Sequence, residues 1–139
     1  MLTFDDMPRC LLALSEGAFK QGASITLLCE NPPEDLPLPI EVQPVSALKD
    51  ISEWADYLAI DLRRESLPEL KSKLANIGSL NGRLEQTGSS RLKAQALIRT
   101  SMPCGSMAQC GVCAVQTGRG HLLACEDGPV FDLDALVRE

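Results

Sequence analysis

Residues 102–131 read MPCGSMAQCGVCAVQTGRGHLLACEDGPVF and contain four of the six cysteines of the chain: Cys104, Cys110, Cys113 and Cys125. Their spacing is C-x5-C-x2-C-x11-C, and a glycine follows each of the first two. Four thiols brought together by short, glycine-bearing loops are typical of a metal site. The segment therefore predicts a small unit folded around a metal centre.

Two kinds of metal centre could use this cysteine pattern. Structural zinc takes four thiolates in a tetrahedron, usually from two close pairs, whereas this chain has one close pair, Cys110 and Cys113. A plant-type [2Fe-2S] cluster takes three cysteines from one loop, spaced C-x4-C-x2-C, and a fourth from elsewhere. The first gap here is one residue longer. We expect a [2Fe-2S] cluster with all four cysteines as ligands, and zinc is the alternative.

Two glycines support the same interpretation. Gly105 and Gly111 allow backbone N–H groups to approach inorganic sulfide closely, a contact that tunes the potential of a cluster. Glu126 and Asp127 stand next to the last cysteine, and we expect them to form a solvated turn rather than a catalytic acid pair.

The other conspicuous residues have ordinary structural interpretations. Cys10 and Cys29 are expected to pack as small apolar side chains, and Trp54 is expected to lie in the core. His121 is the only histidine, which excludes a Rieske centre with two histidine ligands. We expect it to face solvent on a hairpin.

Upstream of the cysteines, apolar runs with strand character alternate with helical segments, which predicts a parallel sheet covered by helices. Asp5 and Asp6 are expected to cap the first helix, with Pro8 in its first turn, and Ser66 has the position of a capping-box serine. The predicted strands are 24–29, 40–45 and 57–62, and the predicted helices are 8–21, 47–54 and one that begins after Ser66.

Residues 78–90 are rich in Gly, Ser, Asn, Thr and Gln, which indicates a linker between two parts. We therefore divide the chain into residues 1–90, an α/β part that ends in this linker, and residues 91–139, a small β-rich metal-binding part. In the second part we expect a strand over 94–100 and a hairpin with strands 112–116 and 121–124. Residues 131–137 form an apolar tail.

Charge and hydropathy exclude other classes of protein. The net charge of -6 and the pI near 4.8 argue against nucleic acid as a partner, because an acidic surface repels phosphate. No run approaches the roughly 20 apolar residues that span a bilayer, and the N-terminal residues lack the pattern of a signal peptide. We therefore expect a cytoplasmic protein, in which clustered cysteines favour metal binding over disulfides.

The segment from Met102 to Phe131 resembles the C-terminal iron–sulfur domain of the electron-transfer subunit of class B dihydroorotate dehydrogenase, a member of the ferredoxin–NADP reductase superfamily. The EDGPVF tail after Cys125 is the most specific element. Residues 8–75 are similar to the later part of the nucleotide-binding domain of this family. The resemblance implies an α/β fold, with a partial, truncated Rossmann-like sheet over residues 1–90 and an iron–sulfur domain over residues 91–139.

The resemblance also implies a function. In that family, electrons pass from dihydroorotate through FMN of a catalytic flavoprotein subunit, across a [2Fe-2S] cluster, to FAD and then NAD, in pyrimidine biosynthesis. Cys104, Cys110, Cys113 and Cys125 would be the cluster ligands. The flavin-binding barrel and the Gly-rich nucleotide turn have no counterpart here, so we expect a fragment without FAD and without dehydrogenase activity of its own. The alternatives are a zinc-binding interaction module and an electron-transfer subunit of another flavin oxidoreductase.

Overall fold

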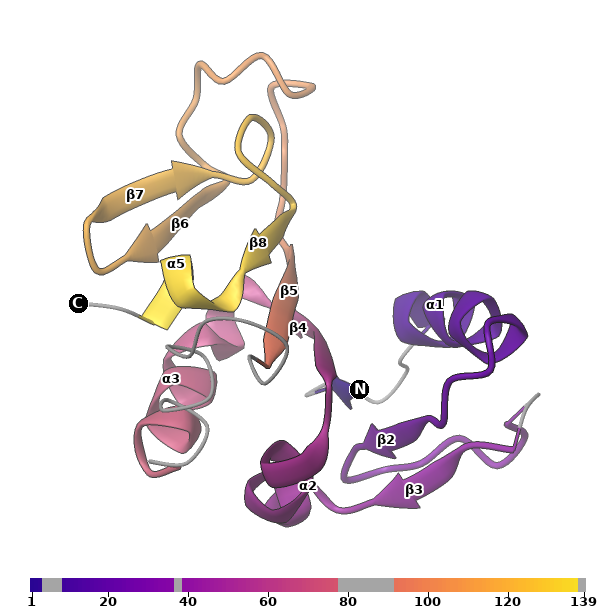
Figure 1. Ribbon diagram of the computed structural model, residues 1–139. Helices are drawn as coiled ribbons and strands as arrows, with labels where there is room; N and C mark the ends of the chain where they lie inside the picture. Colours follow the sequence, from indigo (N-terminus) through magenta and orange to yellow (C-terminus); the bar gives the residue numbers. More distant parts are fainter. Residues whose placement is uncertain (4–8, 37–38, 78–91, 138–139) are drawn as a thin grey trace.

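The computed structural model describes residues 1–3, 9–36, 39–77 and 92–137 (Figure 1). The expected caps Asp5 and Asp6, the first-turn residue Pro8 and the linker over residues 78–90 lie outside the described residues. Within the described part, no helix is long and apolar enough to cross a membrane.

Six strands form one mixed sheet in the order β3-β2-β1-β4-β5-β8. The pairs from β3 to β5 are parallel, and β8 is antiparallel to β5. This is the 3-2-1-4-5 order of a Rossmann-like sheet with one antiparallel strand added at the edge. The strands are β1 Leu2–Thr3, β2 Thr26–Leu28, β3 Glu41–Gln43, β4 Tyr57–Arg63, β5 Lys93–Arg99 and β8 Val130–Asp132.

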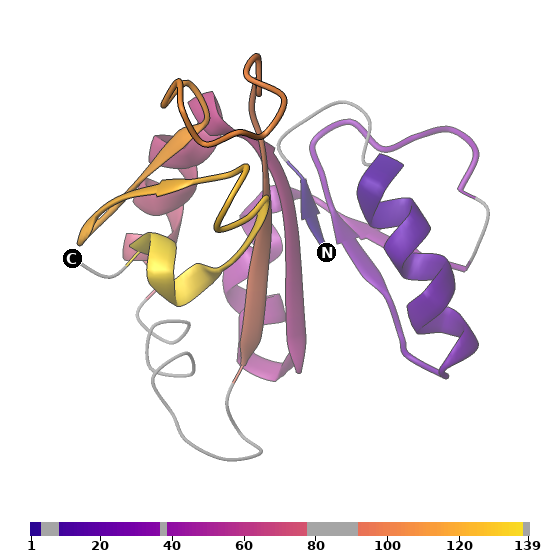
Figure 2. The same cartoon turned by 90° about the horizontal axis from the view of Figure 1, so that it is seen from above.

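Helices cover both faces of the sheet. The helical elements are α1 Arg9–Lys20, the 3-10 turn η1 Val45–Ala47, α2 Leu48–Trp54, the 3-10 turn η2 Arg64–Ser66, α3 Leu67–Ala75 and α5 Leu133–Val137. Figures 1 and 2 show α1 on one side of the sheet and α2, α3 and α5 on the other. A separate antiparallel hairpin, formed by β6 Ala114–Thr117 and β7 Gly120–Leu123, lies on the same side as α3 and α5.

The alternation of side chains along β4 explains why this strand is almost wholly apolar. Leu58, Ile60 and Leu62 point into the larger core, whereas Ala59 belongs to a smaller cluster with Leu11 of α1. A parallel strand with helices on both faces needs apolar residues at consecutive positions rather than at every second one. The predicted strand over 57–62 is thus confirmed and continues to Arg63.

The central strand β1 is absent from the sequence-based expectations. It has only two residues, and it pairs through Leu2 with Leu28 of β2 and with Ile60 of β4. Leu2 is fully buried. Two residues are too few to show a period, so this strand is identified by its neighbours and not by its own pattern.

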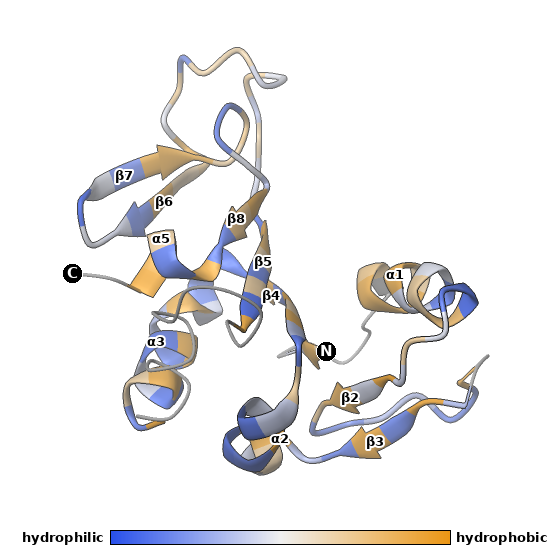
Figure 3. Cartoon of the chain, viewed as in Figure 1, coloured by the Kyte–Doolittle hydropathy of each residue, from blue (hydrophilic) through white to orange (hydrophobic). Residues whose placement is uncertain are grey.

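Four local expectations are wrong. Trp54 is 59% exposed, because it ends α2 at the surface rather than in the core. The helical spacing of Leu11, Leu14 and Phe19 in the sequence predicts one buried face of the first helix, but Leu14 and Phe19 are exposed. Figure 3 shows the apolar residues of α1 in orange. Cys10 is exposed, although Cys29 is buried as expected. Ser66 forms no side-chain cap, because the preceding 3-10 turn already holds its backbone in a helical conformation.

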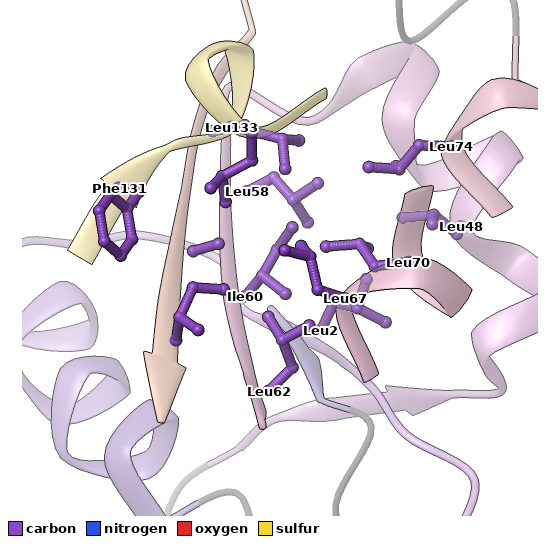
Figure 4. Close-up of a cluster of buried hydrophobic side chains, with 14 of the residues drawn as sticks. Leu2, Leu48, Leu58, Ile60, Leu62, Leu67, Leu70, Leu74, Phe131 and Leu133 are labelled. Carbon is purple, nitrogen blue, oxygen red and sulfur yellow. The ribbon is translucent and has the colours of Figure 1, made fainter. Parts of the chain in front are cut away.

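One core joins the sheet to the cysteine-rich segment. Leu133 of α5 lies close to Leu58 of β4 in Figure 4, and both are in the same buried cluster as Cys113 and Val115. β5, which follows the expected boundary at residues 90–91, pairs with β4 along its full length. The division of the chain into residues 1–90 and 91–139 stays a prediction. Residues 100–129, which include the four cysteines, lie outside the six-stranded sheet.

Candidate metal centre

The four cysteines lie on the loops beyond the carboxyl end of β5. Cys104 and Cys110 belong to the long loop that follows β5, Cys113 immediately precedes β6, and Cys125 follows β7 (Figure 1). In the β6–β7 hairpin, Ala114 pairs with Leu123 and Thr117 with Gly120. Because the strands of a hairpin run side by side, two residues 12 apart in sequence meet at its open end.

Cys113 and Cys125 form one close pair of sulfurs. Their Sγ atoms are hydrogen-bonded at 3.3 Å, and the Ala124 N–H donates to the Cys113 carbonyl at 3.1 Å. Cys113 is only 1% exposed. The Cys125 backbone N–H and thiol lower the pKa of Cys113, whereas the hydrogen bond to Cys113 and burial raise the pKa of Cys125. The two thiols of this pair are therefore inequivalent, with their pKa values shifted in opposite directions.

Cys104 and Cys110 form the second pair. A hydrogen bond from the Cys110 side chain, together with one from the Gln109 backbone N–H, lowers the pKa of Cys104 to about 7. Thiolates are the form in which cysteine binds metals. Backbone N–H groups that point at a sulfur stabilise its negative charge, both as a free thiolate and as a ligand.

The two pairs adjoin each other but do not merge into one four-sulfur cluster. The Ala108 backbone N–H donates to Cys125, and the charge of Cys104 acts on Cys125, so the loop that contains Cys104 folds back over the hairpin. Among the described residues, no three Cys, His, Asp or Glu side chains converge so that they could bind a single ion. The donor set is thus two pairs of soft sulfur ligands.

The loop between Cys104 and Cys110 is curled by residues with positive φ. Gly105 and Gly111 have φ near +62° and +66°, the conformation expected of glycine, but Ser106 and Ala108 have φ of 67° and 55° as well. Left-handed non-glycine residues are uncommon. Ala108, one of these two residues, directs its N–H toward Cys125. Sequence patterns carry no signal for Ser106 and Ala108 in this role.

The α/β part contacts this segment through side chains that sequence analysis missed. Arg64 Nη1, at the carboxyl end of β4, donates to the backbone carbonyls of Val112 and Ala114, the second at 3.4 Å. Lys71 Nζ of α3 donates to the Gln116 carbonyl at 3.3 Å. These contacts join residues 45 to 50 positions apart, so no local motif predicts them.

The remaining candidate residues lie at the surface. His121 faces solvent on the hairpin, as predicted, and Glu126 and Asp127 are both exposed. The Leu123 N–H donates to Asp127 Oδ2 at 2.7 Å, which closes the turn after β7 and favours the structural interpretation of this acid pair.

The EDGPVF tail has a packing role. The Ile98 N–H donates to the Pro129 carbonyl at 2.9 Å, and β8 begins at the next residue. Phe131 is 3% exposed, and its ring lies directly against Gly128. A Cβ atom at Gly128 would be 2.5 Å from Phe131 Cζ. The tail therefore fastens the end of the cysteine segment to the edge of the sheet.

We expect the Gly128→Ala variant to be destabilised by about 1–3 kcal/mol, because the buried Phe131 ring must shift to admit a methyl group. Urea unfolding of the metal-free protein under reducing conditions measures this change. Gly17 is the matched control, because a Cβ at that position meets no atom within 4 Å, and alanine favours a helix interior. Equal stability of the Gly128→Ala variant and the wild type would contradict the packing argument.

Comparison with known protein families supports the interpretation of the four-cysteine segment as a metal-binding segment. Residues 100–137 match the family model described as the iron–sulfur cluster binding domain of dihydroorotate dehydrogenase B. The matched range includes all four cysteines and the EDGPVF tail, so the resemblance predicted from these residues is confirmed for this part of the chain. No curated protein matches the chain, and no solved structure does.

Proposed function

We propose, on the premise that residues 100–137 are an iron–sulfur cluster binding segment of the dihydroorotate dehydrogenase B kind, that this protein transfers electrons through a [2Fe-2S] cluster. Cys104, Cys110, Cys113 and Cys125 would be its ligands. The protein would act as part of the electron-transfer subunit of a dihydroorotate dehydrogenase. Its partner would be a catalytic flavoprotein.

The observation that carries the proposal is the arrangement of the sulfurs in two pairs. In a binuclear cluster each iron takes two cysteine thiolates, and four cysteines complete the set. Cys104 with Cys110 and Cys113 with Cys125 correspond to such a division. A zinc ion would instead require all four thiolates around one centre at about 2.3 Å. The pairing favours the binuclear cluster.

The bound cluster would supply the redox chemistry by accepting and releasing one electron at a time. The polypeptide would hold the four thiolates, direct backbone N–H groups at their sulfurs and shield one side of the site. Cys113 is buried against the core, whereas Cys110 and the neighbouring Gly111 are exposed. One side of the site is therefore packed against protein and the other faces outward, where an electron-transfer partner could approach.

We expect protein purified without oxygen to contain about two iron and two acid-labile sulfide per chain, with a rhombic EPR signal after reduction by dithionite. This measurement tests the cluster directly. Stoichiometric zinc without sulfide, persisting after anaerobic reconstitution with iron, would refute the electron-transfer function and favour a zinc-braced interaction module.

A second experiment tests the partner. A tagged form of the protein, expressed in its native cell, should co-purify with a dihydroorotate-oxidising flavoprotein, and dihydroorotate should then reduce the cluster through that flavoprotein. Reduction of the cluster by a different flavin oxidoreductase, with no response to dihydroorotate, would retain the electron-transfer role and overturn the assignment to pyrimidine synthesis.

A further inference from the structure

We infer that Arg64 is a positioning residue for the metal centre: its guanidinium holds the backbone on both sides of Cys113 and places a positive charge next to the cluster. This inference rests on the proposed function, because it assigns to Arg64 an effect on cluster lifetime and potential. Arg64 lies 40 residues before the first of the four cysteines in sequence, outside the cysteine-rich segment and outside residues 100–137.

The geometry begins at the end of β4. Arg64 is the first residue of η2, directly after β4 leaves the sheet at Arg63. The sheet holds β4 between β1 and β5, so the base of the Arg64 side chain is fixed by the most extensively paired part of the fold. The side chain leaves the carboxyl edge of the sheet and reaches the hairpin.

At its other end the guanidinium contacts two carbonyls. Nη1 donates to the Val112 carbonyl and to the Ala114 carbonyl. Cys113 lies between these two residues, and its sulfur is 3.3 Å from that of Cys125. The two hydrogen bonds fix the backbone immediately before and after this ligand. The left-handed curl at Gly111, where φ is +66°, lies directly before these residues.

Arginine suits this role better than lysine does. Its planar guanidinium offers several N–H donors in a fixed fork, whereas an ammonium group is a compact point charge on a flexible chain. Hydrogen bonds from a charged donor are stronger than those between neutral groups. Arg64 is also within 4 Å of Glu65, at 3.7 Å, but this neighbour is largely exposed and pairs of this kind are weak. The positive charge is therefore not neutralised at the metal centre.

The charge has a consequence of its own. A reduced [2Fe-2S] cluster carries one more negative charge than the oxidised cluster, and a nearby cation stabilises the reduced form. Arg64 should therefore raise the midpoint potential of the cluster. The backbone contacts and the charge are two separable effects of one side chain. Both contacts come from Nη1, whose N–H groups lie in the fixed plane of the guanidinium, whereas lysine keeps the charge on a freely rotating ammonium group.

The test compares Arg64→Ala, Arg64→Lys and Arg119→Ala with the wild type, each loaded with iron and sulfide without oxygen. Arg119 is a matched control, because it is an exposed arginine in the β6–β7 turn of the same hairpin. Two quantities are measured: the rate at which visible absorbance is lost in air, and the midpoint potential from an EPR-monitored redox titration. Thermal unfolding of each metal-free variant reports whether the fold is retained.

For Arg64→Ala we expect the cluster to be lost about tenfold faster, on the scale of one charged hydrogen bond, and the midpoint potential to fall. Arg64→Lys should keep the wild-type potential while losing its cluster faster than the wild type does. Arg119→Ala should match the wild type in both quantities, because solvent screens its charge. This pattern would establish both effects of Arg64.

Several results would overturn the inference. Wild-type lifetime and potential in Arg64→Ala would show that Arg64 does not act on the cluster, while the proposed function would stand. If Arg119→Ala changed the cluster lifetime and the midpoint potential as much as Arg64→Ala does, the effect would be one of general surface charge and not of the position of Arg64. If Arg64→Ala does not fold, a wild-type lifetime in Arg64→Lys still refutes the role of the fixed guanidinium contacts. A wild-type protein that takes up zinc instead of iron and sulfide would refute the proposed function itself.

Discussion

The Cys113→Ser variant is expected to assemble no stable cluster, with iron content falling from about two atoms per chain to near zero after anaerobic reconstitution. A serine hydroxyl does not ionise at neutral pH and is a hard ligand, whereas iron–sulfur centres require soft thiolates. Cys113 is 1% exposed and hydrogen-bonded to Cys125, so no water or neighbouring side chain can replace it easily. The loss should be larger than that caused by any positioning residue.

Cys10→Ser is the matched control for this variant. Cys10 is exposed on α1 and lies outside the metal centre, so we expect wild-type iron and sulfide content. Iron and sulfide assays, with visible absorbance, measure both variants under the same conditions. Full cluster content in Cys113→Ser would remove this cysteine from the ligand set and with it the two-pair arrangement.

The second large effect concerns the shared core. Leu133→Ala should lower the free energy of unfolding by about 2–5 kcal/mol, because Leu133 is fully buried and its removal leaves a cavity. Leu133 lies next to Leu58 of the sheet (Figure 4) and in the same cluster as Val115 of the hairpin. Loss of packing at this position should therefore weaken both parts of the molecule together.

Urea unfolding of the reduced, metal-free protein measures this change, and Val130→Ala provides the control. Val130 is 49% exposed, so its truncation should change the free energy of unfolding by less than about 0.5 kcal/mol. A change below about 1 kcal/mol in Leu133→Ala, or two separate unfolding transitions in the wild type, would contradict a single core that joins the hairpin to the sheet.

Secondary-structure elements are predictable from this sequence where a few neighbouring residues carry a clear pattern. The strand at 57–62 is confirmed because a run of consecutive apolar residues marks a strand that is covered on both faces. The helix after Ser66 is confirmed because its apolar residues recur at helical spacing. The hairpin turn at 117–120 is confirmed because glycine marks it. β1 is not predictable from the sequence, because two residues show no period. Trp54 lies at the surface, because apolar character alone does not determine which side of a helix end is buried.

The candidate metal centre also has features that the sequence predicts and features that only the tertiary structure shows. Cysteine spacing, the two adjacent glycines and the EDGPVF tail are contiguous in the chain, and they sufficed to predict a metal-binding segment similar to a known iron–sulfur domain. Three features arise only in the tertiary structure: the association of the sulfurs in two pairs, the contact of Arg64 with the backbone around Cys113, and the packing of Phe131 on Gly128. The first two depend on strands and loops that meet only after the chain has folded, and the third depends on the turn that brings β8 back to β5. A pattern of neighbouring residues cannot encode the distance between side chains that long loops bring together.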